Sequence, residues 1–231
     1  MQSLAPVHRI VLFSGVVLAS ACAPTFAPPL RTQMGGAPGR VYEGDVEVAG
    51  AATGRGAPAY GGPTLAIGVS PRVAIEGGGE FAAAATGDSG WALGFAGTRI
   101  TGRVPARRRL TLVGDNELGI GAGVGGTNCQ PAEGCDTDRR WYQRPAGGAY
   151  AGFGGALRWR VPALYTRIRA QVMGAQRVPV TAWTTWSTGL ELRFVERVSV
   201  WAGIGLWNYA NRVNRFSGGF YELGLAVTIP R

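Results

Sequence analysis

The chain contains no lysine, and its single histidine, His8, lies near the start of the sequence. Beyond that position there is no imidazole to serve as a general base or as a metal ligand, so histidine-dependent catalysis is not expected. No run of 18 or more apolar residues occurs after the N-terminal region, which argues against a helical membrane protein. Strands of a membrane barrel are invisible to that criterion, because their apolar residues alternate with polar ones.

The composition points to one folded β-rich domain. The 231 residues include 38 glycines and seven tryptophans, and the net charge is +9, with 23 arginines against 14 acidic residues. A net positive charge of this size suggests nucleic acid as a binding partner. The arginines are nevertheless scattered through expected turns and loops, and no single patch collects them. We therefore expect no nucleic-acid binding.

Residues 184–231 show the clearest pattern, which is the period of two that is typical of strands. Large apolar residues alternate with small or polar ones in three consecutive runs of about 9–11 residues, the length that a tilted strand needs to cross a bilayer. The mostly apolar face carries Trp186, Thr188, Leu190, Leu192 and Phe194, then Val198, Val200, Ala202, Ile204 and Leu206, then Tyr221, Leu223, Leu225, Val227 and Ile229. Periodicity alone does not say which face is turned outward.

Similar runs continue back to residue 40 and predict an all-β, closed antiparallel up-and-down transmembrane barrel of about ten strands, with eight as the alternative. We expect the first strand at 41–52 and the fourth at 91–102, where Trp91, Leu93 and Phe95 form the predicted lipid face. Short connections that often contain proline alternate with longer polar ones, as in outer-membrane barrels with short periplasmic turns and long external loops. An even strand count places both ends of the barrel in the periplasm.

Residues 1–21 have the features of a secretory signal: a short basic flank, an apolar core and small residues before a cleavage point. Small residues directly before Cys22 resemble the lipobox of bacterial lipoproteins, and the same residues fit ordinary signal cleavage. Cys22 is therefore the candidate lipidation site. Residues 22–39 are rich in proline and glycine and predict a flexible tether, followed by the barrel at 40–231.

If Cys22 carries lipid, the other two cysteines remain as a pair. Cys129 and Cys135 bracket a short polar loop in a compartment where disulfides persist. We predict a disulfide between them, with two free thiols as the alternative. We expect no metal site and no cofactor.

The charged residues of the strands fall mostly on one face, which predicts a charged lumen. A charge facing lipid would cost about 2–4 kcal/mol near the midplane. The predicted luminal charge cluster comprises Glu43, Asp45, Glu47, Glu76, Asp115, Glu117, Arg158, Arg167, Arg169, Glu191, Arg193 and Glu222, with Glu80 on the same face. Glu191 is expected to pair with Arg167 or Arg169, and Arg99 falls on the predicted lipid face. The acids outnumber the cations of their strands, and what balances them stays open.

Taken together, the amphipathic strands, proline turns and exported N-terminus resemble those of small bacterial outer-membrane β-barrel proteins. The resemblance covers residues 40–231 and is architectural. It implies a monomer in the bacterial outer membrane, in contact with its lipid. Lipopolysaccharide is a further expected partner, since arginines of the predicted outer loops suit phosphate contacts.

The expected function is that of a non-enzymatic barrel with a structural, adhesive or narrow-pore role, with Cys22 as its candidate lipid anchor. One alternative is a soluble periplasmic lipoprotein barrel that binds a hydrophobic ligand. Another is an enzyme acting on lipid through luminal carboxylates such as Asp115 and Glu117.

Overall fold

The structure is a computed structural model that describes residues 27–54, 59–83, 89–107, 110–127, 144–175, 178–194, 197–212 and 215–230. These residues form ten strands. They are β1 (Val46–Gly54), β2 (Ala59–Gly68), β3 (Val73–Ala83), β4 (Ser89–Arg107), β5 (Leu110–Thr127), β6 (Arg144–Trp159), β7 (Pro162–Ala175), β8 (Val178–Phe194), β9 (Val198–Ala210) and β10 (Arg215–Ile229). Within the described residues, no helix is long and apolar enough to cross a membrane.

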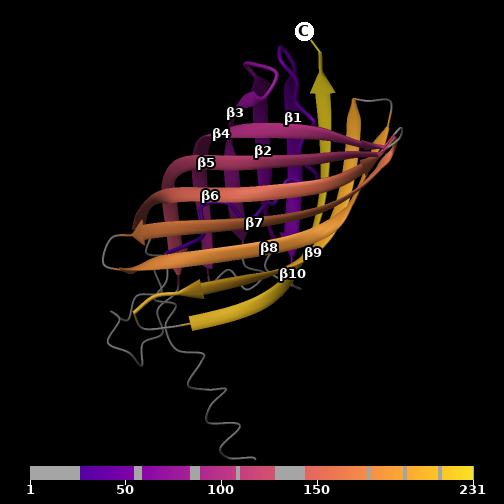
Figure 1. Cartoon of the computed structure of the whole chain (residues 1–231). Coiled ribbons are helices and arrows are strands. Elements are labelled where there is room, and N and C mark those ends of the chain that lie inside the picture. The colour runs from indigo at the N-terminus through magenta and orange to yellow at the C-terminus, as the bar shows by residue number, and fades with distance from the viewer. Residues whose placement is uncertain are drawn as a thin grey trace, which may run out of the picture.

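Each strand pairs antiparallel with the next one along the chain, and β10 closes the ring on β1 (Figure 1). The closing seam runs in register from Val46 opposite Ile229 to Gly54 opposite Tyr221. A closed ring leaves no unpaired sheet edge, which is the condition for a β-structure to cross hydrocarbon. The prediction of a ten-stranded, closed up-and-down barrel is confirmed.

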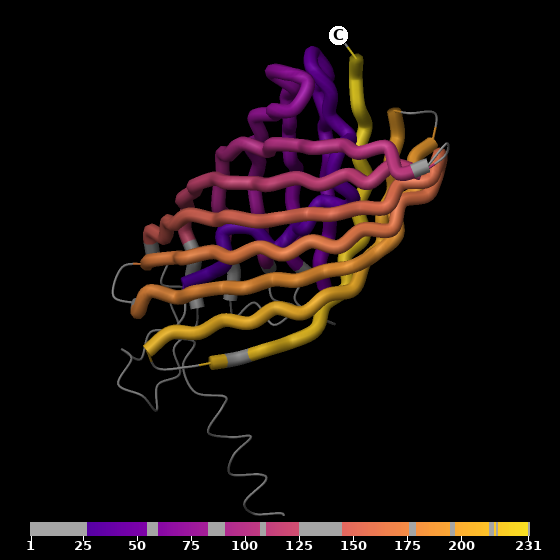
Figure 2. The backbone as a smooth tube through the Cα atoms, viewed as in Figure 1, coloured from indigo at the N-terminus to yellow at the C-terminus, as the bar shows by residue number. Residues whose placement is uncertain are grey.

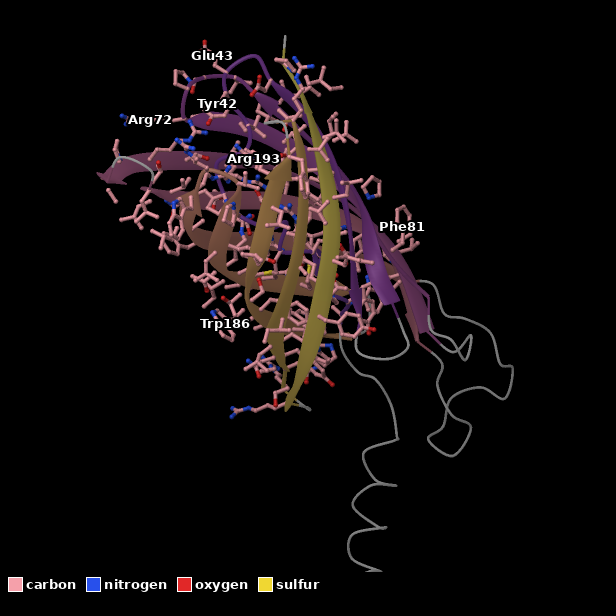
Figure 3. The ribbon with its side chains drawn as sticks, turned by 90° about the vertical axis from the view of Figure 1, so that its right-hand side faces the viewer. Tyr42, Glu43, Arg72, Phe81, Trp186 and Arg193 are labelled. Atoms are coloured by element: carbon pink, nitrogen blue, oxygen red, sulfur yellow. The ribbon has the colours of Figure 1, made fainter. Side chains whose placement is uncertain are left out.

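The wall has an apolar outside and a polar inside. In β7, Leu164 is 60% exposed on the outer surface, whereas Arg167 and Arg169 on the alternate face are buried. Figure 3 shows Phe81 and Trp186 projecting away from the barrel wall. A soluble protein arranges these residue types the other way, because burial of apolar side chains drives its folding.

The fourth strand is turned over relative to its predicted orientation. Leu93 and Phe95 of β4 are buried in the lumen, and Arg99 lies on the same inner face. The outward positions between them carry small residues, Ala92, Gly94 and Ala96. The reason is an apolar cluster inside the barrel, in which Leu93 and Phe95 pack with Leu30. A bulky apolar residue in a strand therefore faces inward where the lumen supplies an apolar partner.

The N-terminal segment also departs from expectation. Its described part, residues 27–40, packs inside the barrel and does not form a free tether (Figure 2). The first strand begins at Val46, several residues later than predicted, because residues 42–45 form a turn at the barrel end. We call residues 27–40 the luminal segment.

A luminal charge network as the candidate functional site

The luminal segment crosses the barrel from one end to the other. At its start, the Ala27 amide donates to Thr181 Oγ1 at 3.0 Å, and Trp183 Nε1 donates to the Ala27 carbonyl at 2.9 Å. At its end, Arg40 pairs with Glu191. Thr181 and Glu191 both belong to β8, and Glu191 lies ten residues after Thr181. Ten strand residues span roughly 33 Å. Ala27 therefore lies at the end of the longer connections, and Arg40 lies at the end where β1 begins and β10 finishes.

Pairs between wall residues occupy the middle of the lumen. Arg167 Nη2 contacts both carboxylate oxygens of Asp115, at 2.9 and 2.7 Å. Two residues further along both strands, Arg169 Nε contacts Glu117 Oε1 at 2.5 Å. All four side chains are buried, and a bidentate or charge-assisted contact is the form of ion pair that best offsets the cost of burial.

The segment itself supplies two further cations. Arg31 Nη1 lies 2.5 Å from Glu76 Oε1 and 3.6 Å from Glu117 Oε2. Arg40 pairs with Glu47 at 2.7 Å and with Glu191 at 3.0 Å. The excess of acids on the strands, which the sequence left unexplained, is thus balanced partly by arginines from outside the strands and partly by Arg99, which contacts Glu76 at 2.5 Å.

Two other carboxylates bind uncharged groups of the segment. Glu222 accepts hydrogen bonds from the amides of Met34, at 2.6 Å, and Gly35, at 3.1 Å. Glu80 accepts hydrogen bonds from the side chains of Thr32 and Gln33. An irregular segment has no ladder to satisfy its backbone, and Glu222 supplies acceptors for two of its amides.

Wall side chains also bind polar backbone groups of the segment. Gln171 accepts from the Arg31 amide and donates to the Arg31 carbonyl, both at 2.9 Å. Arg169 Nη1 donates to the Gln33 carbonyl at 2.6 Å. The segment is therefore held by a specific set of contacts along its length.

Glycine at position 36 is favoured both by the backbone conformation and by the space around it. Gly36 has φ of +66°, a conformation that side-chain-bearing residues rarely adopt. A Cβ at this position would lie 2.8 Å from Arg40 Nη1 and 2.9 Å from both Glu191 Oε2 and Trp201 Cδ2. The segment approaches the wall this closely only because residue 36 lacks a side chain.

Most of the predicted luminal charges lie where the alternation placed them. The buried members are Glu47, Glu76, Asp115, Glu117, Arg167, Arg169, Glu191 and Glu222, and Glu80 joins them. The side chains of Arg158 and Arg193 are partly exposed at the barrel end.

Two predicted members of the luminal cluster lie outside the lumen. Glu43 is exposed in the turn before β1, and the carboxylate of Asp45 accepts the Tyr42 amide at 3.0 Å in the same turn. Alternation does not apply to either residue, because both precede the strand. Figure 3 shows Glu43 and Tyr42 together at this end of the molecule.

The predicted partner of Glu191 was wrong. Glu191 contacts Arg40, Arg158 at 3.5 Å and Arg193 at 4.0 Å, whereas Arg167 and Arg169 bind Asp115 and Glu117. The prediction also missed Arg31, Arg40 and Arg99 as members of the network. The surplus of strand acids was the signal for the first two. The shared parity of Arg99 with Leu93 and Phe95 was the signal for the third.

Several predictions fall on residues that the structure does not describe. These are the signal peptide, lipidation at Cys22 and the disulfide between Cys129 and Cys135. Within the described ranges, no group of three or more His, Cys, Asp or Glu side chains is arranged to hold a metal ion. The chemistry that these residues display is ion pairing and hydrogen bonding.

Several solved structures are similar to this chain in fold. No family model matches the chain, and no curated protein matches its sequence. A crystal structure of the N-terminal β-barrel domain of Pseudomonas aeruginosa OprF is similar with a TM-score of 0.41 and 10% identity, covering 81% of this chain and 98% of that one. A loop L8 deletion mutant of OmpT, an outer membrane protein of Vibrio cholerae, is similar with a TM-score of 0.25 and 9% identity, covering 80% and 98%.

Proposed function

We propose that this protein is an integral outer-membrane β-barrel with a non-enzymatic, structural role, and that the luminal segment closes its lumen. The observation that carries the proposal is the polarity of the wall: large apolar side chains cover its outside, and charges fill its inside. Exposed apolar surface of this extent is unfavourable in water and favourable against lipid tails. A soluble periplasmic barrel, the first alternative, would require the opposite polarity.

The filled lumen favours a closed barrel over a narrow pore. The segment brings the apolar side chains of Leu30 and Met34 and two arginines into the interior, and all four residues are buried. Side chains of wall and segment form one apolar cluster near Ala27 and a second around Ala37 and Trp201. Ions crossing the barrel would have to displace these groups.

The same contacts weigh against an enzyme that uses luminal carboxylates. Asp115 and Glu117 are bound by Arg167 and Arg169, and both acids are buried. A buried carboxylate that is already engaged by a guanidinium has no free path to a substrate.

The proposal includes a lipid anchor and a surface that contacts lipopolysaccharide. Cys22 is the candidate lipid anchor. Arg212 and Arg215, which are exposed at the end of the longer connections, are candidate contacts for lipopolysaccharide phosphates.

The proposal is tested by fractionation, gel migration and conductance of the full-length protein. We expect it in the detergent-extracted outer membrane, with different migration for unheated and boiled samples, as a barrel that resists detergent until heated. In planar bilayers we expect no steady ion current. Release into the soluble periplasmic fraction would overturn the membrane assignment, and a stable open current would overturn the closed lumen.

A further inference from the structure

The guanidinium of Arg40 occupies a site that the barrel wall builds around it. Its Nε and Nη2 contact the two oxygens of Glu47 at 2.7 and 3.1 Å, and its Nη1 contacts Glu191 Oε2 at 3.0 Å. Its Cζ lies 4.6 Å from the centroid of the Trp201 ring. A forked contact to one carboxylate, a second carboxylate and an aromatic face together match a planar guanidinium and do not match an ammonium ion.

The three wall residues are held in place by neighbours within the wall. Trp201 Nε1 donates to Glu222 Oε1 at 2.5 Å, which fixes the orientation of the ring. Glu191 also contacts Arg158 and Arg193. Glu47 is set by the ladders that β1 forms with β10 and β2. The site is therefore preorganised by four neighbouring strands, β1, β10, β9 and β8.

The ring of strands is complete without the luminal segment. The pairing of β1 with β10 starts at Val46, and residues 27–40 belong to no strand. Arg40 is held at the site by the hydrogen bonds and the ring contact of its side chain, and not by strand pairing. From the side of the wall, Arg40 therefore has the position of a bound ligand that is tethered to the chain.

We propose that Glu47, Glu191 and Trp201 form a guanidinium-binding site, which Arg40 fills in this structure and which accepts a free guanidinium cation when Arg40 is absent. The site lies near the barrel end, next to Arg158 and Arg193, whose side chains are 14% and 12% exposed. This inference goes beyond the proposed function and does not depend on where in the cell the barrel resides.

Arg31 provides an internal comparison. Its Cζ lies 4.6 Å from the Phe95 ring centroid, and it contacts Glu76 and Glu117. Those two acids are also bound by the wall cations Arg99 and Arg169. Loss of Arg31 leaves both carboxylates partly neutralised, so we expect a weaker site there.

The test is chemical rescue in the full-length protein. Arg40→Ala empties the site, and the thermal transition of the refolded barrel is followed by gel migration. We expect Arg40→Ala to unfold at a lower temperature than wild type. Methylguanidinium at low-millimolar concentration should restore at least half of that loss and should saturate, whereas methylammonium at the same concentration should not. Arg31→Ala should recover less.

Matched variants separate the site from general salt effects. Arg72→Ala removes an exposed arginine and should show no response to methylguanidinium. Adding Glu191→Gln to Arg40→Ala should abolish the rescue. An equal response to the two cations, or an equal response of Arg40→Ala and Arg72→Ala, would overturn the proposal. If Arg40→Ala refolds poorly, the refolding yield is the readout, and a yield that methylguanidinium does not raise above methylammonium has the same meaning.

Discussion

Replacing Leu118 by arginine tests the orientation of the barrel wall directly. Leu118 is the ninth of the 18 residues of β5, and its side chain is 63% exposed on the outer surface. Eight or nine residues separate it from each end of the strand, which corresponds to about 20 Å of depth at a tilt of about 40°. The position is therefore close to the middle of the apolar band.

The expected cost depends strongly on what surrounds this side chain. An arginine near the midplane of a bilayer costs about 2–4 kcal/mol, which lowers the folding equilibrium constant about 30-fold to 700-fold. In water, a largely exposed surface position tolerates the same change within about 0.5 kcal/mol. The two environments thus predict outcomes that a single measurement separates.

The free energy of unfolding is measured by reversible urea titration of the protein refolded in phospholipid vesicles, followed by tryptophan fluorescence. Ile229→Arg is the matched control, because Ile229 is 53% exposed but is the last residue of β10. We expect that control to cost about 0–1 kcal/mol, since the penalty falls toward the interface. A near-zero cost at Leu118, or equal costs at the two positions, would refute a lipid-facing wall.

Three further predictions concern the lumen and are measured by the same urea titration. Gly36→Ala should destabilise the barrel by about 1–3 kcal/mol because of its positive φ and its close neighbours, whereas Gly102→Ala, where a Cβ meets nothing within 4 Å, should change stability by less than about 0.5 kcal/mol. Asp115→Asn should cost about 3 kcal/mol, because it removes the nearer anion of the buried Arg167 guanidinium and leaves only Glu117, at 3.6 Å; a change below about 1 kcal/mol would mean that Glu117 or water compensates for the loss. Glu47→Gln should cost about 3 kcal/mol, because Arg40 loses its forked partner and keeps only the contact to Glu191, and Glu43→Gln should be neutral within about 0.5 kcal/mol; equal effects would place both acids in one environment.

The alternation of side chains was sufficient to predict the strands and most of their faces. In β7 to β10, every second residue is turned outward as expected, because a strand in a closed wall has only two directions available. The same rule placed Asp115, Glu117, Arg167 and Arg169 in the lumen. It failed at Glu43 and Asp45, because strand ends are set by the turn geometry at residues 42–45, which alternation does not encode.

The luminal segment could not be predicted from composition. Proline and glycine are frequent both in mobile tethers and in packed segments without regular structure. What distinguishes the two is the presence of partners, such as Glu222 for the amides of Met34 and Gly35, and these partners lie far away in the sequence. The orientation of β4 was predicted wrongly for the same reason. Phe95 faces inward to pack against Leu30, a partner that the sequence of β4 does not show.

The enclosed segment has a consequence for the order of assembly. It belongs to the first part of the chain, yet Met34 and Gly35 are bound by Glu222 of β10, the last strand. Those hydrogen bonds exist only once the final strand has joined the sheet. The contacts that hold this early part of the chain are therefore completed late in assembly, after the C-terminal strand has been placed.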